Sequence, residues 1–311
     1  MNTTPEIQDV ADGSPVIERP SRWPFAVALV ALIIGFGPTL YALIRFSLQN
    51  ELFSHIVLVP LVSAYLVWIK RDQLATFTSP DRRIAAVLLA AGVLTLGWYG
   101  LTASGRELVL QDRLAYKTLA FAFLFTGVCA VFLGRQTLRS IAFPLAFLIF
   151  LAPMPVVWVD AIESFLQHKS ASAASGFFTL YGTPFFREVT FFQLPGINLE
   201  VAPECSGIRS SLALFITSIV AGYLFLRSPV KRVVLALAVI PLAILRNGFR
   251  VFVIGELCVH VSPDMINSYI HRQGGPIFFA LSLIPFFLLL WILLRLDRPK
   301  QRPAETVARA V

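Results

Sequence analysis

Cys205 is the residue of this sequence whose type and position most clearly allow chemistry. It is followed by Ser206, Gly207 and a long apolar run. A helix that begins there would favour a thiolate, because its unpaired N–H groups carry partial positive charge. Arg209 adds a cation one turn further on, and the free N–H groups are suited to hold an oxyanion. Cys205 is therefore a candidate nucleophile; tight packing, or a disulfide with Cys258, is the alternative.

Three polar residues interrupt another apolar run: Arg246, Asn247 and Arg250. The two arginines are one helical turn apart. An arginine at the centre of a membrane helix costs roughly 2.5–3.5 kcal/mol or more, so each needs a partner or a wet cavity. The arginines either snorkel, pair with Glu204 or Glu256, or serve a function, and for Arg250 we favour a functional role.

Histidines supply the candidate acid–base group. His271 lies in the segment before the last apolar run. A histidine with a pKa near 6.5 can take a proton from a thiol and return it to a leaving amine. His260 is a rival by position, although capping of a helix end explains it equally well. His55 begins the second apolar run, where an interfacial histidine is the simpler interpretation.

Together these residue types permit acyl transfer. The Cys205 thiolate would attack a peptide carbonyl, and His271 would act as general base and then as general acid. Arg250 would orient the peptide or stabilise the oxyanion. Ser206, Gly207, Arg209, Arg246, Asn247 and His55 are the candidate supporting or substrate-binding residues.

The composition implies that membrane helices position these groups. Of 311 residues, 57% are hydrophobic and 14% are charged, and the mean hydropathy is +0.74. A soluble globular protein is roughly 45–50% apolar and about 25% charged. Three cysteines without a Cys-x-x-Cys spacing exclude a disulfide scaffold, and we expect no metal and no cofactor. The net charge of +8 is the lysine and arginine excess of a cytoplasmic membrane face, so the expected partner is a lipid bilayer and no nucleic acid.

We therefore expect an all-α polytopic membrane protein with about eight transmembrane helices. Each apolar run approaches the roughly 20 residues that span a bilayer. The expected spans are Trp23–Ile44, Leu52–Ile69, Ile84–Leu101, Leu114–Leu133, Ile141–Val159, Ile208–Leu226, Val233–Gly255 and Pro276–Leu294. Residues 1–22 are expected to be a polar cytoplasmic tail, 23–295 a single membrane domain and 296–311 a basic cytoplasmic tail.

Charge sets the orientation of these helices, because cytoplasmic loops are rich in lysine and arginine. With both termini in the cytoplasm, that side receives sixteen of the 26 lysines and arginines: Arg19, Arg22, Lys70, Arg71, Arg82, Arg83, Arg135, Arg139, Arg227, Lys231, Arg232, Arg295, Arg298, Lys300, Arg302 and Arg309. The four histidines and Cys205 then lie on the outer side.

The outer loop 160–207, between the fifth and sixth helices, is far longer than a turn, which is typical of a functional loop. Residues 161–178 place Ile162, Phe165 and Leu166 on one helical face, as in a helix lying in the membrane interface. Residues 187–194 and 197–201 flank a Pro-Gly turn, which predicts a small extracytoplasmic β-hairpin that leads to Cys205.

The sequence resembles a known family, the exosortases of the exosortase/archaeosortase superfamily. The resemblance covers nearly all of the helices. It rests on Ser54-His55 with Leu58-Val59-Pro60-Leu61, Pro153-Met154-Pro155, Leu199-Glu200-Val201, Cys205-Ser206-Gly207-Ile208-Arg209, Asn247-Gly248-Phe249-Arg250-Val251, and His271 with Gly275 and Phe279.

The resemblance implies that Cys205, Arg250 and His271 are the catalytic residues of a membrane cysteine protease or transpeptidase. Its substrates would be exported proteins with a C-terminal sorting signal: a Pro-Glu-Pro-type motif, a transmembrane helix and a basic cluster. Cleavage would occur through an acyl-enzyme, on the periplasmic side of the inner membrane of a Gram-negative producer of exopolysaccharide. The acceptor nucleophile is left open.

Three other functions stay open. A transporter or channel would explain the polar residues inside a membrane helix, although we find no internal repeat. A membrane metalloprotease would use His55, His260 and His271, but the sequence has no His-Glu-x-x-His motif. A serine protease would use Ser206 or Ser210, without a Gly-x-Ser-x-Gly elbow.

Overall fold

The computed structural model describes residues 23–71, 81–105, 107–202, 206–267 and 274–297. Within them, six helices are long and apolar enough to cross a membrane, and up to eight spans result if each of two bent helix pairs counts as one. One small antiparallel sheet accompanies the helices. The predicted all-α polytopic fold is confirmed. The predicted division into two tails and one membrane domain stays a prediction.

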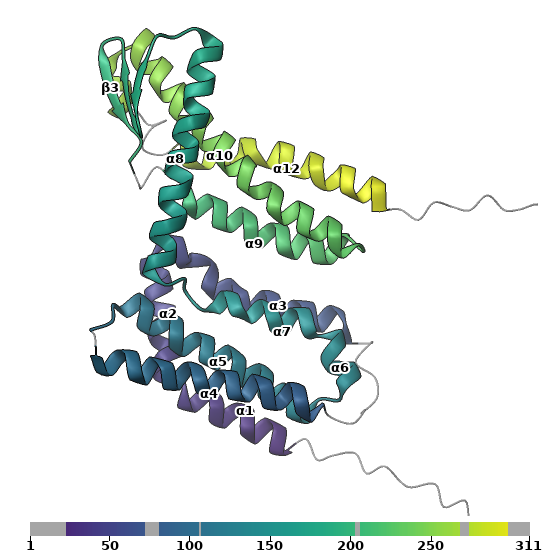
Figure 1. Ribbon diagram of the computed structural model, residues 1–311. Helices are drawn as coiled ribbons and strands as arrows, with labels where there is room; N and C mark the ends of the chain where they lie inside the picture. The colour runs from purple at the N-terminus through teal and green to yellow at the C-terminus, as the bar shows by residue number, and fades with distance from the viewer. Residues whose placement is uncertain (1–22, 72–80, 106, 203–205, 268–273, 298–311) are drawn as a thin grey trace, which may run out of the picture. The chain divides into compact units, whose positions relative to one another are not determined.

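The chain forms two compact units, and the first comprises residues 1–45 and 56–153. In it α4 packs against α5, α5 also contacts α1, and α3 packs against α7 (Figure 1). Its elements are α1 (Trp23–Gly35), most of α2 (Gly37–Gln49), α3 (Leu58–Ile69), α4 (Arg82–Gly105), α5 (Leu110–Phe132), α6 (Arg135–Ser140), α7 (Ala142–Phe147) and η3 (Leu148–Leu151).

Two of the expected spans are not single straight helices. The span predicted over residues 23–44 is formed by α1 and α2, which are bent by 59°. The span predicted over residues 141–159 is wrong as one helix, because α7 and η3 end at Leu151 and the next helix begins at Val156. Pro153 and Pro155 explain this break, since proline lacks an N–H donor and disfavours the helical conformation in the residue before it.

The second unit comprises residues 46–55 and 154–311. The long helix α10 is central to it and contacts α8, α9 and α12 (Figure 1). The elements of this unit are the first part of η1 (Glu51–Val57), α8 (Val156–Tyr181), β1 (Phe186–Glu188), β2 (Phe191–Leu194), β3 (Ile197–Glu200), α9 (Ile208–Phe225), α10 (Pro229–His260), η5 (Pro263–Asn267) and α12 (Gly275–Asp297). The helix predicted over residues 161–178 is thus confirmed as part of α8.

The two ends of α10 are buried in different apolar clusters. Its first half packs with α9 and α12 around Leu214, Leu235 and Phe286. Its last turns pack with α8 and the sheet around Phe178 and Phe192. Because α10 is 32 residues long, it extends about 48 Å, well beyond the roughly 30 Å of a bilayer core. The helix is thus long enough to pack in one apolar cluster at its first half and in another at its last turns.

Close contact between α10 and α8 depends on Gly248. A Cβ atom at this position would lie 2.6 Å from the Cβ of Ala173 and 3.0 Å from the carbonyl oxygen of Ser170. Any larger residue would therefore push the two helices apart.

The sheet contains three strands in the order β1-β2-β3, so the prediction of a simple hairpin is incomplete. The Pro195-Gly196 turn joins β2 to β3 as expected, with Leu194 opposite Ile197. The predicted first arm folds back on itself, because a turn at Val189 and Thr190 separates β1 from β2. Alternation along β3 buries Leu199 and leaves its neighbours exposed, so that one face of the sheet covers α10.

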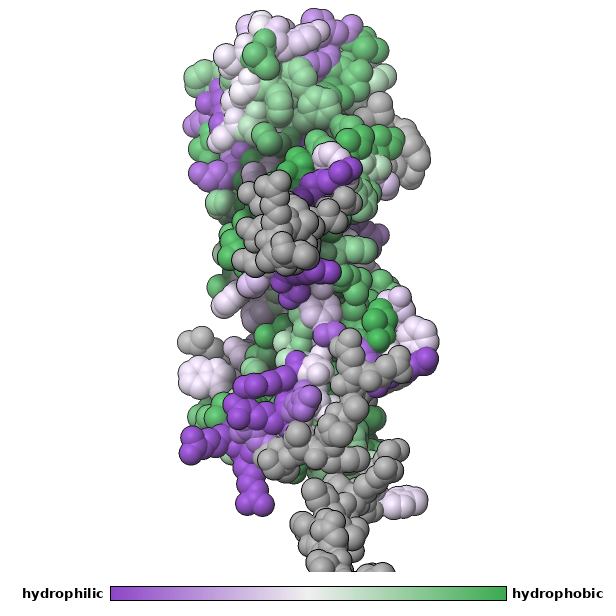
Figure 2. Space-filling model, turned by 90° about the vertical axis from the view of Figure 1, so that its right-hand side faces the viewer, coloured by the Kyte–Doolittle hydropathy of each residue, from purple (hydrophilic) through white to green (hydrophobic). Residues whose placement is uncertain are grey.

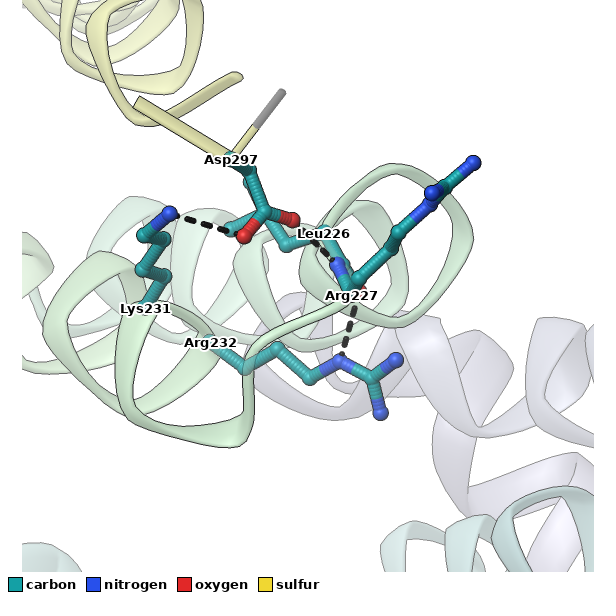
Figure 3. Close-up of polar contacts among 5 residues, drawn as sticks. All are labelled: Leu226, Arg227, Lys231, Arg232 and Asp297. Atoms are coloured by element: carbon teal, nitrogen blue, oxygen red, sulfur yellow. Dashed lines mark hydrogen bonds and ion pairs between the residues drawn. The ribbon is translucent and has the colours of Figure 1, made fainter. Parts of the chain in front are cut away.

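The first turn of α10 is joined to the end of α12. Asp297 accepts hydrogen bonds from the backbone N–H of Arg227 at 2.6 Å and from Nζ of Lys231 at 2.8 Å, and Arg232 donates from Nε to the carbonyl oxygen of Leu226 at 2.8 Å (Figure 3). Hydrophilic side chains appear together with apolar ones on the face where α12 ends (Figure 2). This cluster of basic residues lies at the opposite end of α10 from the second apolar cluster.

Candidate functional site

The first turn of α9 is organised around the carbonyl oxygen of Gly207. Gly207 precedes the helix in the left-handed region, with φ +75°, which favours glycine. Its carbonyl oxygen accepts a hydrogen bond from the backbone N–H of Ser211 at 3.0 Å. The hydroxyl groups of Ser211 and Ser210 also donate to it, at 2.7 Å and 3.1 Å. The residue two positions after Cys205 is therefore held firmly.

Arg246 contacts this turn from α10. Its Nη2 donates to the carbonyl oxygen of Gly207 at 3.2 Å and to the hydroxyl oxygen of Ser211 at 3.3 Å. A Cβ atom at Gly207 would lie 2.9 Å from Nη2 and 3.4 Å from Oδ1 of Asn247. Arg246 and Asn247 were predicted as one polar group and Gly207 as part of another; the structure brings the two groups together.

Two buried donor groups at this place have no hydrogen-bond acceptor among the described residues: Nη1 of Arg246 and Nδ2 of Asn247. Arg246 is 9% exposed and Asn247 is 2% exposed. A buried polar group that lacks a partner costs about 1–3 kcal/mol. The contact between α10 and the start of α9 thus holds donors that are available to an acceptor from elsewhere.

A small cavity lies between β3 and α10 beside these donors. Its volume is about 20 Å³, room for roughly one water molecule. Among the described residues, Asn247, Arg250 and Glu200 are its polar lining residues, and the apolar ones are Leu199, Val201, Val251 and Ile254. Arg250 is half-buried. One of its lining residues, Val201, precedes Cys205 by four positions in the sequence.

The expected acidic partners of the arginines are only partly tested. Glu256 does not pair with Arg246; its Oε1 accepts a hydrogen bond from Thr183 at 2.5 Å and its Oε2 lies 3.1 Å from Nε2 of His260. Glu204 lies outside the described residues. His260, at the end of α10, therefore contacts Glu256, and the ring of Tyr181 lies edge-on to its imidazole.

Ser206 has a partner that sequence analysis missed. Its buried hydroxyl donates to Oε1 of Glu163 on α8 at 3.3 Å, and it accepts from the backbone N–H of Ile208 at 3.4 Å. Sequence spacing offers no signal for a contact between residues so far apart in the chain. Neither Ser206 nor Ser210, the alternative nucleophiles, has a histidine partner among the described residues.

Arg209 and His55 belong to the second unit and are not among the described residues that line the cavity. Arg209 forms an ion pair with Glu51 of η1, and both side chains are largely exposed. His55, four residues after Glu51, is half-buried, and its Nδ1 lies 3.2 Å from the carbonyl oxygen of Leu52. The cation predicted beside Cys205 is therefore paired with a carboxylate.

The two residues predicted to carry nucleophilic and acid–base chemistry, Cys205 and His271, lie outside the described residues. Cys258, the predicted alternative partner of Cys205, is 2% exposed and belongs to the apolar cluster around Phe178. Among the described residues, no group of three or more histidine, cysteine or acidic side chains is placed to hold a metal ion.

The family model described as transmembrane exosortase matches residues 47–288 of this chain. The match runs from the end of α2 into α12 and includes every residue of the site. No curated protein and no solved structure matches the chain.

Proposed function

Because the chain belongs to the transmembrane exosortase family, we propose that it is a membrane-embedded cysteine peptidase or transpeptidase. Its substrates are exported proteins held at the membrane by a C-terminal sorting signal. The signal consists of a Pro-Glu-Pro-type motif, a transmembrane helix and a basic cluster. The enzyme cleaves beside that motif and releases the protein from its membrane helix.

In this mechanism Cys205 is the nucleophile. His271 removes the thiol proton and later returns it to the leaving amine. Arg250 orients the substrate peptide or stabilises negative charge on its carbonyl oxygen. Water or an amine then resolves the acyl-enzyme, which decides between hydrolysis and transfer.

One observation carries the proposal: Arg246 donates to the carbonyl oxygen of Gly207 at 3.2 Å. This bond joins the polar part of α10 to the residue two positions after Cys205. Arg250 follows Arg246 by one helical turn on the same helix. The contact supports a site in which Cys205 and Arg250 act on one substrate.

We place this site at the periplasmic face of the inner membrane, with both termini in the cytoplasm. Arg250 is roughly 32 Å along the helix axis from Pro229, about one bilayer core. A helix that enters the membrane near Pro229, where Lys231 and Arg232 lie, carries Arg250 to the opposite boundary. The basic cluster at that entry favours the cytoplasm.

Co-expression with a tail-anchored substrate tests the function. The substrate carries a Pro-Glu-Pro motif, a transmembrane helix and a basic cluster, and its size is followed by gel. We expect cleavage with the natural chain and with Cys129→Ala, because Cys129 is buried on α5 in the other unit. We expect none with Cys205→Ala. Cleavage that persists in Cys205→Ala would exclude the thiol mechanism.

A further inference from the structure

We propose that the side-chain amide of Asn247 is an oxyanion donor, and that the cavity between β3 and α10 receives the carbonyl oxygen of the scissile peptide bond. This inference rests on the proposed peptidase function. It assigns a catalytic role to a residue whose part in the site is otherwise undefined.

The first support is the unpartnered state of the amide. Asn247 is 2% exposed, and its Nδ2 has no acceptor among the described residues. A buried donor without an acceptor destabilises the free protein. The terminal torsion of asparagine is broad, so the amide can turn its N–H toward the cavity at little cost.

The second support is the size of the cavity that Asn247 lines. About 20 Å³ accommodates roughly one water molecule, and a carbonyl oxygen is of the same size. The cavity is thus too small for a side chain and large enough for one oxygen atom.

The third support is the polarity of the lining. Beside Asn247 and Arg250, the described lining includes four apolar residues: Leu199, Val201, Val251 and Ile254. In an apolar setting a fixed donor stabilises developing negative charge more strongly than in water. Glu200, the acidic residue among the described lining residues, is exposed to solvent, so water screens its charge.

The Cys205 thiolate forms a bond to the carbonyl carbon, and the π electrons of the carbonyl move onto its oxygen. Asn247 stabilises that oxygen by donating a hydrogen bond. When the oxygen re-forms the double bond, the C–N bond breaks, and the amine leaves with the proton that His271 took from the thiol.

Two variants test the donor. Asn247→Ala removes it, and Asn247→Asp replaces the N–H donor by an oxygen with nearly the same shape. With a purified enzyme and a synthetic sorting peptide, we expect kcat to fall by about 100- to 1000-fold, while KM changes by less than about threefold. A matched control is Asn198→Ala on the exposed face of β3, which we expect to retain full activity.

A peptide aldehyde provides a second measurement, because its adduct with the thiol carries an oxygen in the oxyanion position. We expect both Asn247 variants to lose affinity for the aldehyde by at least tenfold and to keep their affinity for the parent peptide. Melting temperatures near that of the natural chain show that the variants fold.

Two results would overturn the inference: kcat within about threefold of the natural value in Asn247→Ala, or equal losses of affinity for aldehyde and parent peptide. Neither result would contradict the proposed function, provided that Cys205→Ala is inactive in the same assay. If Cys205→Ala cleaves the peptide, the proposed function itself fails.

Discussion

Nη2 of Arg246 lies 3.2 Å from the carbonyl oxygen of Gly207 and donates a hydrogen bond to it. This contact joins two helices that belong to one unit but are formed by separate parts of the sequence. The same carbonyl oxygen accepts from the backbone N–H of Ser211. The arginine therefore adds little to closing the first turn of α9. Its larger consequence is to hold Gly207, the residue before α9, against α10.

Substitution of Gly207 by alanine tests this contact. The new Cβ would lie 2.9 Å from Nη2 of Arg246, so the guanidinium must move and lose its bonds to Gly207 and Ser211. Alanine in the left-handed region adds a cost of about 1–3 kcal/mol. We expect cleavage to fall by more than about tenfold, measured as initial rate in detergent.

Gly182→Ala is the matched control. Gly182 also has a positive φ, of +91°, but a Cβ atom there would have no neighbour within 4 Å. The variant carries the conformational cost without the clash, and we expect it to melt earlier yet retain activity. If Gly207→Ala and Gly182→Ala lose activity equally, backbone strain alone explains the loss, and the contact with Arg246 does not.

Arg246→Met separates function from stability. Methionine has a similar length but brings no buried charge, and replacing a buried charge by an apolar residue is often neutral or stabilising. We expect a melting temperature equal to or above that of the natural chain and at least a tenfold loss of cleavage. A melting temperature more than about 4 °C below that of the natural chain would instead identify Arg246 as a structural residue.

Arg250→Lys tests the need for a planar guanidinium. A lysine keeps the charge but cannot form the two-pronged contact with a peptide group or carboxylate. We expect a loss of cleavage of more than about tenfold. Arg209→Lys, in an exposed pair with Glu51, should stay within about threefold because such pairs contribute roughly 0–1 kcal/mol. Unchanged cleavage in Arg250→Lys would leave Arg250 without a catalytic role.

Thr183→Val tests the link between the end of α8 and α10. Thr183 donates to Oε1 of Glu256 at 2.5 Å, and loss of the hydroxyl leaves a buried carboxylate short of a donor. We expect the free energy of unfolding to fall by about 1–3 kcal/mol, with Thr183→Ser close to the natural value. Denaturation of the purified protein in detergent measures this, and identical stability of the valine and serine variants would contradict it.

The sequence predicts much of the fold because membrane helices depend on apolar length. The helices α4, α9, α10 and α12 lie within or around the apolar runs from which they were expected. The failures occur where local chemistry outweighs hydropathy. Pro153 and Pro155 break a run that is apolar enough to span, and the turn at Val189 divides a strand that shows no glycine or proline.

The site could be predicted by residue type but not by contact. Arg246, Asn247 and Gly207 were identified from their position in apolar surroundings, which makes polar groups conspicuous. Their mutual contact depends on how α9 packs on α10, and periodicity along one helix does not predict that packing. Glu163 and Glu51 were missed because their partners are distant in the chain, and periodicity along a single helix says nothing about such pairs.

The most direct test of the central claim is to identify the atom that carries the acyl group. The purified enzyme is mixed with the sorting peptide, quenched in acid within the first turnover, digested and analysed by mass spectrometry. The account predicts that Cys205 gains the mass of the amino-terminal peptide fragment as a thioester, and that the adduct disappears in Cys205→Ala together with cleavage. An acyl group on any other residue, or cleavage that proceeds in Cys205→Ala, would contradict it.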